Sequence, residues 1–444
     1  MALSRPAPDT GRPPAARTSG LAAVPFGATR SAARLEALLG NPRDPGNPYG
    51  RSRLWAAGYD ALPAPPAGLP GTGEPLPAAD QLARALRPLF RRDLALAHAW
   101  IIRPLLGTPV PHPAAALLGP AALLASVGGV LRSAVRVVDG LGRYEPAAGQ
   151  WRPVLASVFA ELLACESLTA AALRSCPARE PGPAGPGPHG PVPPRRPGRS
   201  LAAVVGYLVP QLAGELLGDL ELVLNECGFD AGTPERRTLA KILRDREFAR
   251  VGWTASGAAQ ARLVRGLNGA GGSWPDDDGT AAAALFRITE AACAPAPGTG
   301  CPRAVAATLA GATDRLAGAA GPGAAALARV GRRLVTELRA LRVDCAAVAE
   351  HDPADPAARA LADREALLTL AAAALGVREA AAGARLPFLG ETGWALLALG
   401  RIAGRLGLPL PEGLPDPQPG VWDELARRAA SGVDCDLYAT GVAW

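Results

Sequence analysis

The chain has 444 residues, enough for two or three domains and for a sizeable hydrophobic core. Its 46 basic and 40 acidic residues give a formal net charge of +6, but Lys241 is the only lysine, and the arginines are interspersed with acids, as in residues 332–337 (RRLVTE). This pattern indicates solvated helix faces and argues against a nucleic-acid-binding stripe.

The N-terminal part, residues 1–78, is dense in proline and glycine, which predicts a partly disordered region with one short amphipathic helix near residues 32–39. It contains no unbroken apolar core of the kind that a secretory signal needs. From residue 79 onwards, apolar residues such as Leu82 and Leu86 recur at helical spacing. We therefore expect a remnant N-terminal helical domain over residues 79–112.

A helical bundle is predicted over residues 113–290, with a flexible Pro/Gly-rich insertion at residues 177–199. Helices are expected at residues 118–138, 154–173, 201–224 and 234–267, where apolar residues recur three and four apart. The first of these is apolar nearly all round, and small residues such as Gly129 would allow a close neighbour. Prolines interrupt the uncharged stretch before it, which favours a buried bundle helix over a membrane span.

An additional helical region is predicted over residues 291–444, with amphipathic segments at residues 303–319, 324–349, 356–382, 392–406 and 421–430. Alternation of polar and apolar residues with a period of two, which would indicate half-buried strands, is almost absent from the chain. The predicted fold class is therefore all-α, a helical bundle with a reduced N-terminal helical region and extra C-terminal helices.

The cysteines and histidines are dispersed. None of the seven cysteines has a Cys-x-x-Cys spacing, and the four histidines have no i, i+4 partner. Structural zinc sites need closely spaced Cys and His ligands, so we expect no metal site of this kind. Reduced thiols are typical of a reducing compartment, and the predicted location is the cytoplasm.

Three segments carry a family resemblance. They are residues 41–48 (NPRDPGNP), residues 90–96 (FRRDLAL) and the paired helical segments of residues 207–256, which include an Arg-Asp pair. In this order they resemble the acyl-CoA dehydrogenase family, in particular its large actinobacterial homologues, over roughly residues 35–290. The resemblance implies an acyl-CoA dehydrogenase-like helical bundle.

The middle β-domain of that family has no counterpart here. In relatives this domain contacts the flavin, whereas in this chain the N-terminal pattern ends near Leu96 and the bundle begins near Leu118, about twenty residues later. So short a segment cannot build a barrel of seven or eight strands. The resemblance therefore implies a family member that lacks the middle β-domain.

The family removes an α-proton and a β-hydride from an acyl thioester, with FAD as the hydride acceptor and a carboxylate as the base. In its common pattern a glutamate stands eight residues after the aspartate of the Arg-Asp pair. Counting from Asp245 gives Trp253, which cannot accept a proton. Some relatives have the base on the first bundle helix, but residues 113–138 contain no acid, and the first one is Asp139. The resemblance thus implies an FAD enzyme fold without the usual catalytic residue.

Both flavin-binding signatures of the family are altered. The Arg-x-x-Phe-Gly signature would fall near Leu141 and Tyr144, and it lacks its arginine and its glycine. The Gln-x-Phe-Gly-Gly signature would fall near Gly228, where Glu226 and Asp230 add negative charge beside the expected phosphates. FAD is therefore implied as the cofactor by resemblance alone, with weakened binding.

Loss of the β-domain would uncover bundle helices, above all residues 118–138, and this predicts association with another protein. The leading hypothesis is a non-catalytic or half-site subunit that pairs with a full-length flavin-dependent acyl-CoA or acyl-carrier dehydrogenase of specialised metabolism, or that forms a homodimer. The alternative is an FAD-dependent acyl-thioester dehydrogenase that is active as a dimer with an unrecognised base. The acyl substrate and its carrier stay open.

A run of three aspartates, Asp276, Asp277 and Asp278, supports a third hypothesis. Together with Trp274, it resembles the repeats of α-helical terpene cyclases, whose carboxylates bind magnesium. The same acids precede an alanine-rich helix from residue 281 and would stabilise its N-terminus. No second acidic cluster accompanies them, which favours helix capping over a metal site.

Overall fold

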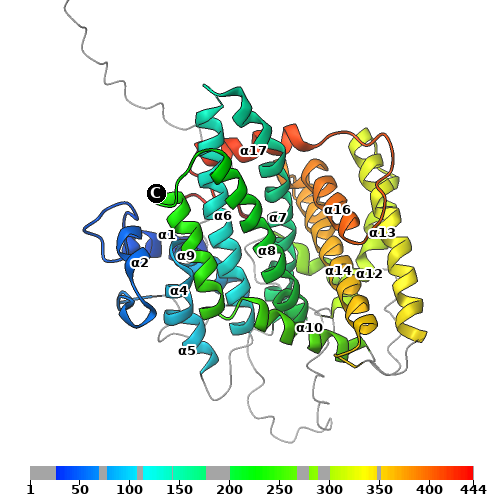
Figure 1. Ribbon diagram of the computed structural model, residues 1–444. Coiled ribbons are helices and arrows are strands. Elements are labelled where there is room, and N and C mark those ends of the chain that lie inside the picture. The colour runs from blue at the N-terminus through cyan, green and yellow to red at the C-terminus, as the bar shows by residue number, and fades with distance from the viewer. Residues whose placement is uncertain are drawn as a thin grey trace, which may run out of the picture.

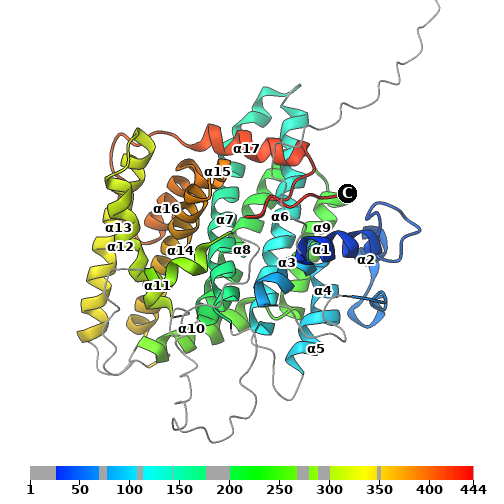
Figure 2. The ribbon, with the colours of Figure 1, turned by 180° about the vertical axis from the view of Figure 1, so that it is seen from behind.

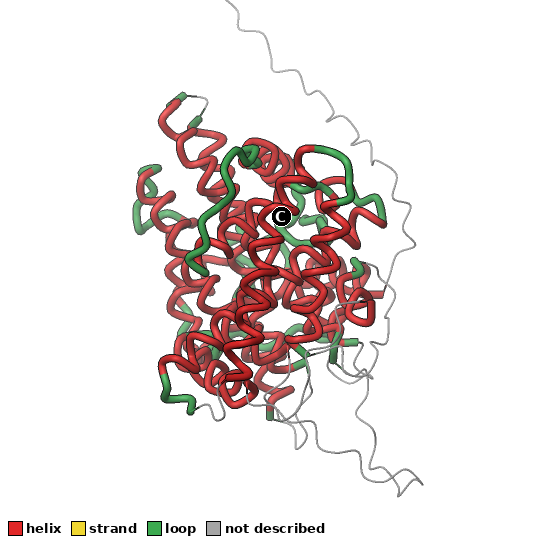
Figure 3. Tube along the Cα trace, turned by 90° about the vertical axis from the view of Figure 1, so that its right-hand side faces the viewer, coloured by secondary structure: helices red, strands yellow, loops and turns green. Residues whose placement is uncertain are grey.

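A computed structural model describes residues 27–69, 78–107, 114–142, 144–176, 201–267, 280–288, 301–347 and 352–443. These ranges are mostly helical and contain no β-strand, only one isolated antiparallel bridge between Val433 and Gly441. Figure 3 shows the described chain as helices joined by loops. The predicted all-α class is confirmed.

Most helices lie where the hydrophobic periodicity predicts them (Figure 1). They are α1 (Gly27–Leu39), α2 (Arg51–Ala56), α3 (Ala79–Arg92), α4 (Leu94–Ala97), α5 (Arg103–Leu106), α6 (Ala115–Leu141), α7 (Arg152–Arg174), α8 (Leu201–Glu226), α9 (Pro234–Phe248), α10 (Trp253–Leu267), α11 (Thr280–Ala283), α12 (Pro302–Ala317), α13 (Pro322–Ala347), α14 (Pro356–Gly383), α15 (Pro387–Gly390), α16 (Gly393–Arg405) and α17 (Gln418–Ala430). Short 3-10 segments at Tyr59–Ala61, Pro146–Trp151 and Ala284–Phe286 and a π-helix at His98–Ile102 supplement them. The Pro/Gly-rich N-terminal region thus contributes α2 in addition to the one helix expected there.

The expected helical run of residues 234–267 is two helices, because the backbone turns between α9 and α10. Arg250 has a positive φ of 55°, an uncommon conformation for a residue with a side chain. Gly252 lies so close to Glu247 that a Cβ at this position would overlap the Glu247 carboxylate. That carboxylate accepts the backbone N–H of Trp253 at 3.0 Å, which caps the first turn of α10.

The central helices are α6, α7, α8 and α14. α6 packs against α3, α7, α8 and α17, while α7 also contacts α14, α16 and α17. In Figures 1 and 2, α12, α13 and α16 lie on one side of these central helices, and α1, α2, α4 and α9 lie on the other. One continuous hydrophobic core includes residues from both sides.

Helices of this chain cover α6, so the argument that its all-round apolar surface requires a partner does not hold. Leu118, Leu124 and Leu131 are fully buried. A Cβ at Gly129 would lie 3.5 Å from the Arg91 side chain of α3. The glycine therefore permits close approach of α3, and a Gly129→Leu change would disturb this internal contact.

Four helical segments among the described residues are long and apolar enough to cross a membrane, by length and composition alone. They are Ala115–Leu141, Pro146–Arg174, Leu201–Glu226 and Pro356–Gly383. In the structure, between 67% and 94% of each apolar window is buried inside the protein. The expectation that the chain does not span a membrane stays a prediction.

Candidate functional site

The position predicted for the catalytic base is a solvent-exposed tryptophan at the start of α10. Trp253 is 67% exposed. The hydroxyl of Ser256 donates to the Tyr207 carbonyl at 2.8 Å, which holds α10 against the N-terminal half of α8. The base position therefore lies on the surface, beside the first turns of α8.

The segments that match the flavin signatures lie at helix ends. Leu141 is the last residue of α6, and Tyr144 just after it is 86% exposed. Glu226 is the last residue of α8, and Gly228 has a positive φ of 75°, as glycines that end helices often do. Asp230 follows as another exposed residue. The described residues of both segments thus lie at helix ends near the surface.

The two signature segments are close to each other but far from the base position. Burial and then the carboxylates of Glu145 and Glu226 raise the pKa of Cys227, which places the ends of α6 and α8 near each other. The turn that leads to the base position lies near the N-terminal half of α8, where Arg246 of α9 donates to the Pro210 carbonyl at 2.8 Å. Between position 210 and position 226, α8 advances by sixteen residue steps, roughly 24 Å at 1.5 Å per residue. The structure does not bring the predicted residues together in one site.

Two further predicted features lie outside the described residues. They are Asp276, Asp277 and Asp278, on which the terpene-cyclase hypothesis depends, and the insertion of residues 177–199. Over the part of the chain that the structure describes, no group of three His, Cys, Asp or Glu side chains is placed to hold a metal ion.

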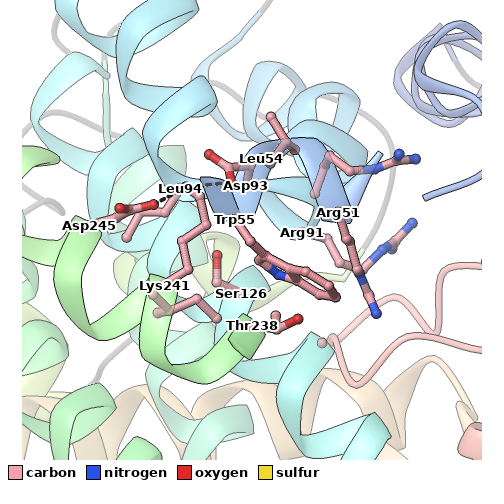
Figure 4. Close-up of a pocket in the computed structure, with 13 residues that line it drawn as sticks. Arg51, Leu54, Trp55, Arg91, Asp93, Leu94, Ser126, Thr238, Lys241 and Asp245 are labelled. Carbon is pink, nitrogen blue, oxygen red and sulfur yellow. Dashed lines mark hydrogen bonds and ion pairs between the residues drawn. The ribbon is translucent and has the colours of Figure 1, made fainter. Parts of the chain in front are cut away.

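A small pocket lined by both charged and apolar side chains lies where α2, α3, α6 and α9 meet (Figure 4). Its volume is about 20 Å³, which is room for one water molecule. Lys241 points towards the carboxylates of Asp93 and Asp245, and Arg51 and Arg91 line the opposite side. The pocket thus joins two groups of charged side chains, which differ in how their charges are balanced.

Lys241, the only lysine of the chain, is buried between two aspartates. Its ammonium lies 2.7 Å from the Asp93 carboxylate and also pairs with Asp245, one helical turn along α9. Asp93 accepts the backbone N–H of Leu96 at 2.9 Å and so caps α4. Burial raises the pKa of Asp93, and the Lys241 ammonium opposes that rise. This triad connects the end of α3 to α9.

The geometry of the triad indicates a structural role for Lys241. A nucleophilic lysine must reach a substrate, whereas the Lys241 ammonium is buried and engaged by two carboxylates. Asp245 also accepts a hydrogen bond from the Tyr59 hydroxyl at 3.3 Å. The Tyr59 ring in turn stacks on Phe248, with 4.0 Å between the ring centres. The charged groups of the triad are therefore engaged in contacts within the fold.

Arg92 closes the C-terminal end of α1. Its guanidinium donates to the carbonyls of Gly40 at 2.5 Å and Tyr49 at 3.0 Å. Burial and then the Arg51 guanidinium lower the pKa of Arg92 to about 10. Because backbone carbonyls carry only partial charges, they compensate the Arg92 charge only in part.

Arg51, the first residue of α2, makes no side-chain hydrogen bond or ion pair within the described ranges. Burial and then the charge of Arg132 lower the pKa of its guanidinium. Arg91 divides its guanidinium between Glu36 and Asp434, each at 2.9 Å. This side of the pocket therefore holds more positive than negative charge.

A second charge cluster lies one turn earlier on α3 and includes the C-terminal segment. Arg87 lies 2.8 Å from Glu166 of α7 and 2.8 Å from Asp434. It also lies 3.3 Å from Asp436, and both aspartates are fully buried. Although burial alone would raise it, Arg87 and Arg91 hold the pKa of Asp434 well below its usual range. Burial raises the pKa of Glu166 to about 7, and Arg87 opposes the rise.

His98 is a buried residue in the π-helical segment. Its Nδ1 has no hydrogen-bond partner within the described residues, and its ring meets Phe248 edge-on at 5.2 Å. Burial, followed by the charges of Arg250 and Arg103, lowers the pKa of His98. These surroundings favour the neutral imidazole.

Comparison with protein-family models, with curated proteins and with solved structures finds no match for this chain. The charge clusters were also not predicted from the sequence, because Arg87 and Asp434 are 347 residues apart. One signal was available for the triad. In a chain whose other basic residues are arginines, the single lysine at position 241 stands out.

Proposed function

We propose that this chain is a non-catalytic helical subunit that binds a full-length flavin-dependent acyl-CoA or acyl-carrier dehydrogenase. The observation that carries the proposal is the exposed Trp253 at the position where the resemblance places the catalytic base. An indole offers no acceptor for an α-proton. A residue at the surface also lacks the water-excluded surroundings in which such chemistry takes place.

The segments expected to bind FAD support a subunit that does not hold the cofactor by itself. Tyr144 is 86% exposed, and Glu226 and Asp230 are exposed as well. Carboxylates beside a pyrophosphate oppose its binding. The pocket of Figure 4, at about 20 Å³, is far smaller than the roughly 300–1,000 Å³ of usual ligand sites.

The α9–α10 corner, formed by Tyr59, Leu243 and Trp253, supplies the surface for the partner in this proposal. These side chains are 37%, 36% and 67% exposed. Exposed aromatic side chains are enriched at protein interfaces, where they bury a large area. Tyr59 is already held by its stacking on Phe248, so it loses little freedom on binding.

Co-expression with candidate dehydrogenases tests the proposal, with light scattering and absorbance spectra of the purified proteins. We expect a stoichiometric complex with a flavin band, and no flavin band in the isolated chain. Trp253→Ser should weaken the complex by about tenfold or more, as expected of an interface anchor. Tyr144→Ser is the matched control, because it removes another exposed aromatic side chain at the other end of the bundle.

A flavin band in the isolated chain would instead favour the alternative, an FAD-dependent dehydrogenase that is active as a dimer. In that case Trp253→Glu, which restores the usual base, should add dehydrogenase activity. A monodisperse monomer that binds neither flavin nor any of the dehydrogenases contradicts both functions.

A further inference from the structure

We propose that the outer face of α10 docks an acidic helix of the partner dehydrogenase. The inference rests on the proposed subunit role and deepens it, because it names the chemistry of the partner surface that meets the α9–α10 corner. The outer face, called the α10 stripe below, consists of exposed residues that recur three and four positions apart. They are Trp253, Thr254, Gly257, Ala258, Arg262 and Arg265.

The opposite side of α10 packs inside the protein. Ser256, Ala259 and Leu263 are buried, and α10 contacts α8 and α14. Figures 1 and 2 show α10 at one end of the bundle. On the stripe itself, a Cβ added at Gly257 would meet no atom of the described residues within 4 Å. The helix is therefore held by its inner side, and the middle of its outer side is open to a partner.

The charge of the α10 stripe is positive. Residues 248–267 contain three arginines and no acid, whereas residues 332–337 combine arginines with a glutamate. Arg262 donates to the Ala258 carbonyl of its own helix at 3.3 Å. Neither Arg262 nor Arg265 forms an ion pair with the residues that the structure describes. Both charges are therefore available to carboxylates of another protein.

Two acids of the chain lie beside α10, and both are engaged elsewhere. Glu247 accepts the backbone N–H of Trp253 at 3.0 Å. Asp363 accepts the Tyr207 hydroxyl and, at 2.7 Å, the Gln260 amide. Within the described ranges, neither carboxylate forms an ion pair with an arginine of the stripe.

The positive surface continues beyond the first turn of α10. Arg250, just before Trp253, and Arg103 of α5 are both exposed. Their charges both lower the pKa of the buried His98, so the two guanidiniums lie near each other around this residue. Trp253 thus stands between the arginines of α10 and those around His98, as an aromatic anchor within a basic surface.

A helix with carboxylates on one face matches the stripe. The 15 residues of α10 extend over roughly 22 Å. The distance between packed helices depends on the side chains at the contact, and the short side chains of Gly257 and Ala258 allow a close approach. Carboxylates three or four residues apart on the partner helix can then meet Arg262 and Arg265. Apolar residues of the same helix cover the Trp253 ring.

Other occupants match the stripe less well. In a two-fold symmetric dimer of this chain, the same arginines would face each other across the contact and repel. Membrane lipids and nucleic acids are bound through many contacts from basic side chains to phosphates. The middle of the stripe, at Gly257 and Ala258, offers no basic side chain for such a contact.

Gly257→Leu tests the docking face in the complex formed by co-expression. Because the position is open and leucine favours a helix more than glycine does, the Tm of the isolated chain should stay equal or rise. The Kd of the complex should increase by about tenfold or more, since the new side chain blocks the close approach. Gly218→Leu is the matched control. It fills another open, exposed helical position, on α8, and should leave the Kd unchanged.

Arg265→Glu tests the charge of the partner. The Kd should increase by about tenfold, mainly through slower association, and sodium chloride should slow the association of the unchanged chain. Arg332→Glu makes the same charge change at an exposed position of α13 and should have no such effect. Surface plasmon resonance measures both rates.

The outcomes separate this inference from the subunit role. A complex that neither Gly257→Leu nor Arg265→Glu weakens more than its control overturns the docking face and leaves the subunit role intact. Weakening by Gly257→Leu alone shows that the partner helix is not acidic. Absence of any complex overturns both proposals. Binding of phosphatidylserine vesicles or duplex DNA that Arg265→Glu abolishes, with the dehydrogenase complex unchanged, assigns the stripe to phosphates and overturns the inference.

Discussion

The two ends of the α3 charge network differ in the source of their negative charge. Arg87 meets three buried carboxylates, two of them from the C-terminal segment. One turn further along, Arg92 meets backbone carbonyls, and Arg51 beside it makes no ion pair within the described residues. Where the chain supplies its own acids, the charges clamp helices together. Where it does not, burial and neighbouring like charges lower the pKa of the guanidiniums.

This difference determines how each region responds to mutation. Removing one partner of a buried ion pair leaves an uncompensated charge, at a cost of about 3–5 kcal/mol. Removing one member of an unbalanced group of like charges relieves repulsion instead. Removal of one charged side chain should therefore lower the free energy of unfolding in the first region and raise it in the second.

The largest effect is expected for Asp434→Asn. This change leaves Arg87 and Arg91 without their shared carboxylate, and neither arginine can lose its charge. Urea unfolding should show a loss of about 4–5 kcal/mol in the free energy of unfolding. Asp423→Asn, at an exposed position of α17, is the control and should change it by less than about 0.5 kcal/mol. Similar losses in both variants would show that the cluster does not clamp the fold.

Lys241→Met should have the next largest effect, about 3 kcal/mol near pH 8. It leaves Asp93 and Asp245 facing each other without the ammonium, but carboxylates can take up a proton. Without Lys241 the pKa of Asp93 rises further, and a raised carboxyl pKa favours the folded state at low pH and loses that effect as the pH rises. The loss should therefore be smaller at pH 5 than at pH 8.

An exposed ion pair provides the control for Lys241→Met. Arg315 pairs with Glu379, and its side chain is 58% exposed. Arg315→Met should cost less than about 1 kcal/mol at either pH. If Lys241→Met lowers the free energy of unfolding by the same amount at both pH values, the charges of the two aspartates do not cause the loss.

His98 should give a smaller, pH-dependent effect. Its pKa is lowered by burial and by Arg250 and Arg103, so its protonation opposes folding. The stability that the neutral ring provides is complete above the unfolded pKa of about 6.5 and is lost as the pH falls through the lower folded value. His98→Phe keeps a ring against Phe248 and removes the titration. When the pH falls from 7.5 to 5.5, the free energy of unfolding should decrease less for this variant than for the unchanged chain. Chemical unfolding at both pH values measures this.

The smallest effect, and the one of opposite sign, is expected for Arg51→Gln. It removes a charge from the unbalanced cluster and breaks no ion pair within the described residues. The free energy of unfolding should rise by about 0.5 kcal/mol. Arg332→Gln on exposed α13 should leave it unchanged. A clear destabilisation by Arg51→Gln would mean that the two regions do not differ in charge balance.

The helices were predictable because hydrophobic periodicity is a local property of the sequence. α6, expected at residues 118–138, extends over Ala115–Leu141, and α14, expected at residues 356–382, extends over Pro356–Gly383. The break between α9 and α10 was missed because it depends on backbone conformation and a cap. Arg250 takes a positive φ there, and the Glu247 side chain folds onto the start of α10.

The candidate sites were predictable only as positions along the chain. Counting residues led to Trp253, and the structure shows that it is exposed and that α10 packs near the opposite end of α8 from the signature segment at Glu226. Counting could not show this, because separation in space depends on how α8, α9 and α10 pack.

The sequence by itself determined that the chain is all-α, where most helices lie and that residue 253 cannot act as a base, because spacing and residue chemistry are local. Only the tertiary structure decided that α6 is covered by the chain's own helices and that Lys241 lies between Asp93 and Asp245. It also decided that the C-terminal segment supplies Asp434 and Asp436 to Arg87, whereas Arg51 forms no ion pair with the residues that the structure describes. Charge balance is a sum over neighbours in space, and neighbours that are hundreds of residues apart meet only in the folded protein.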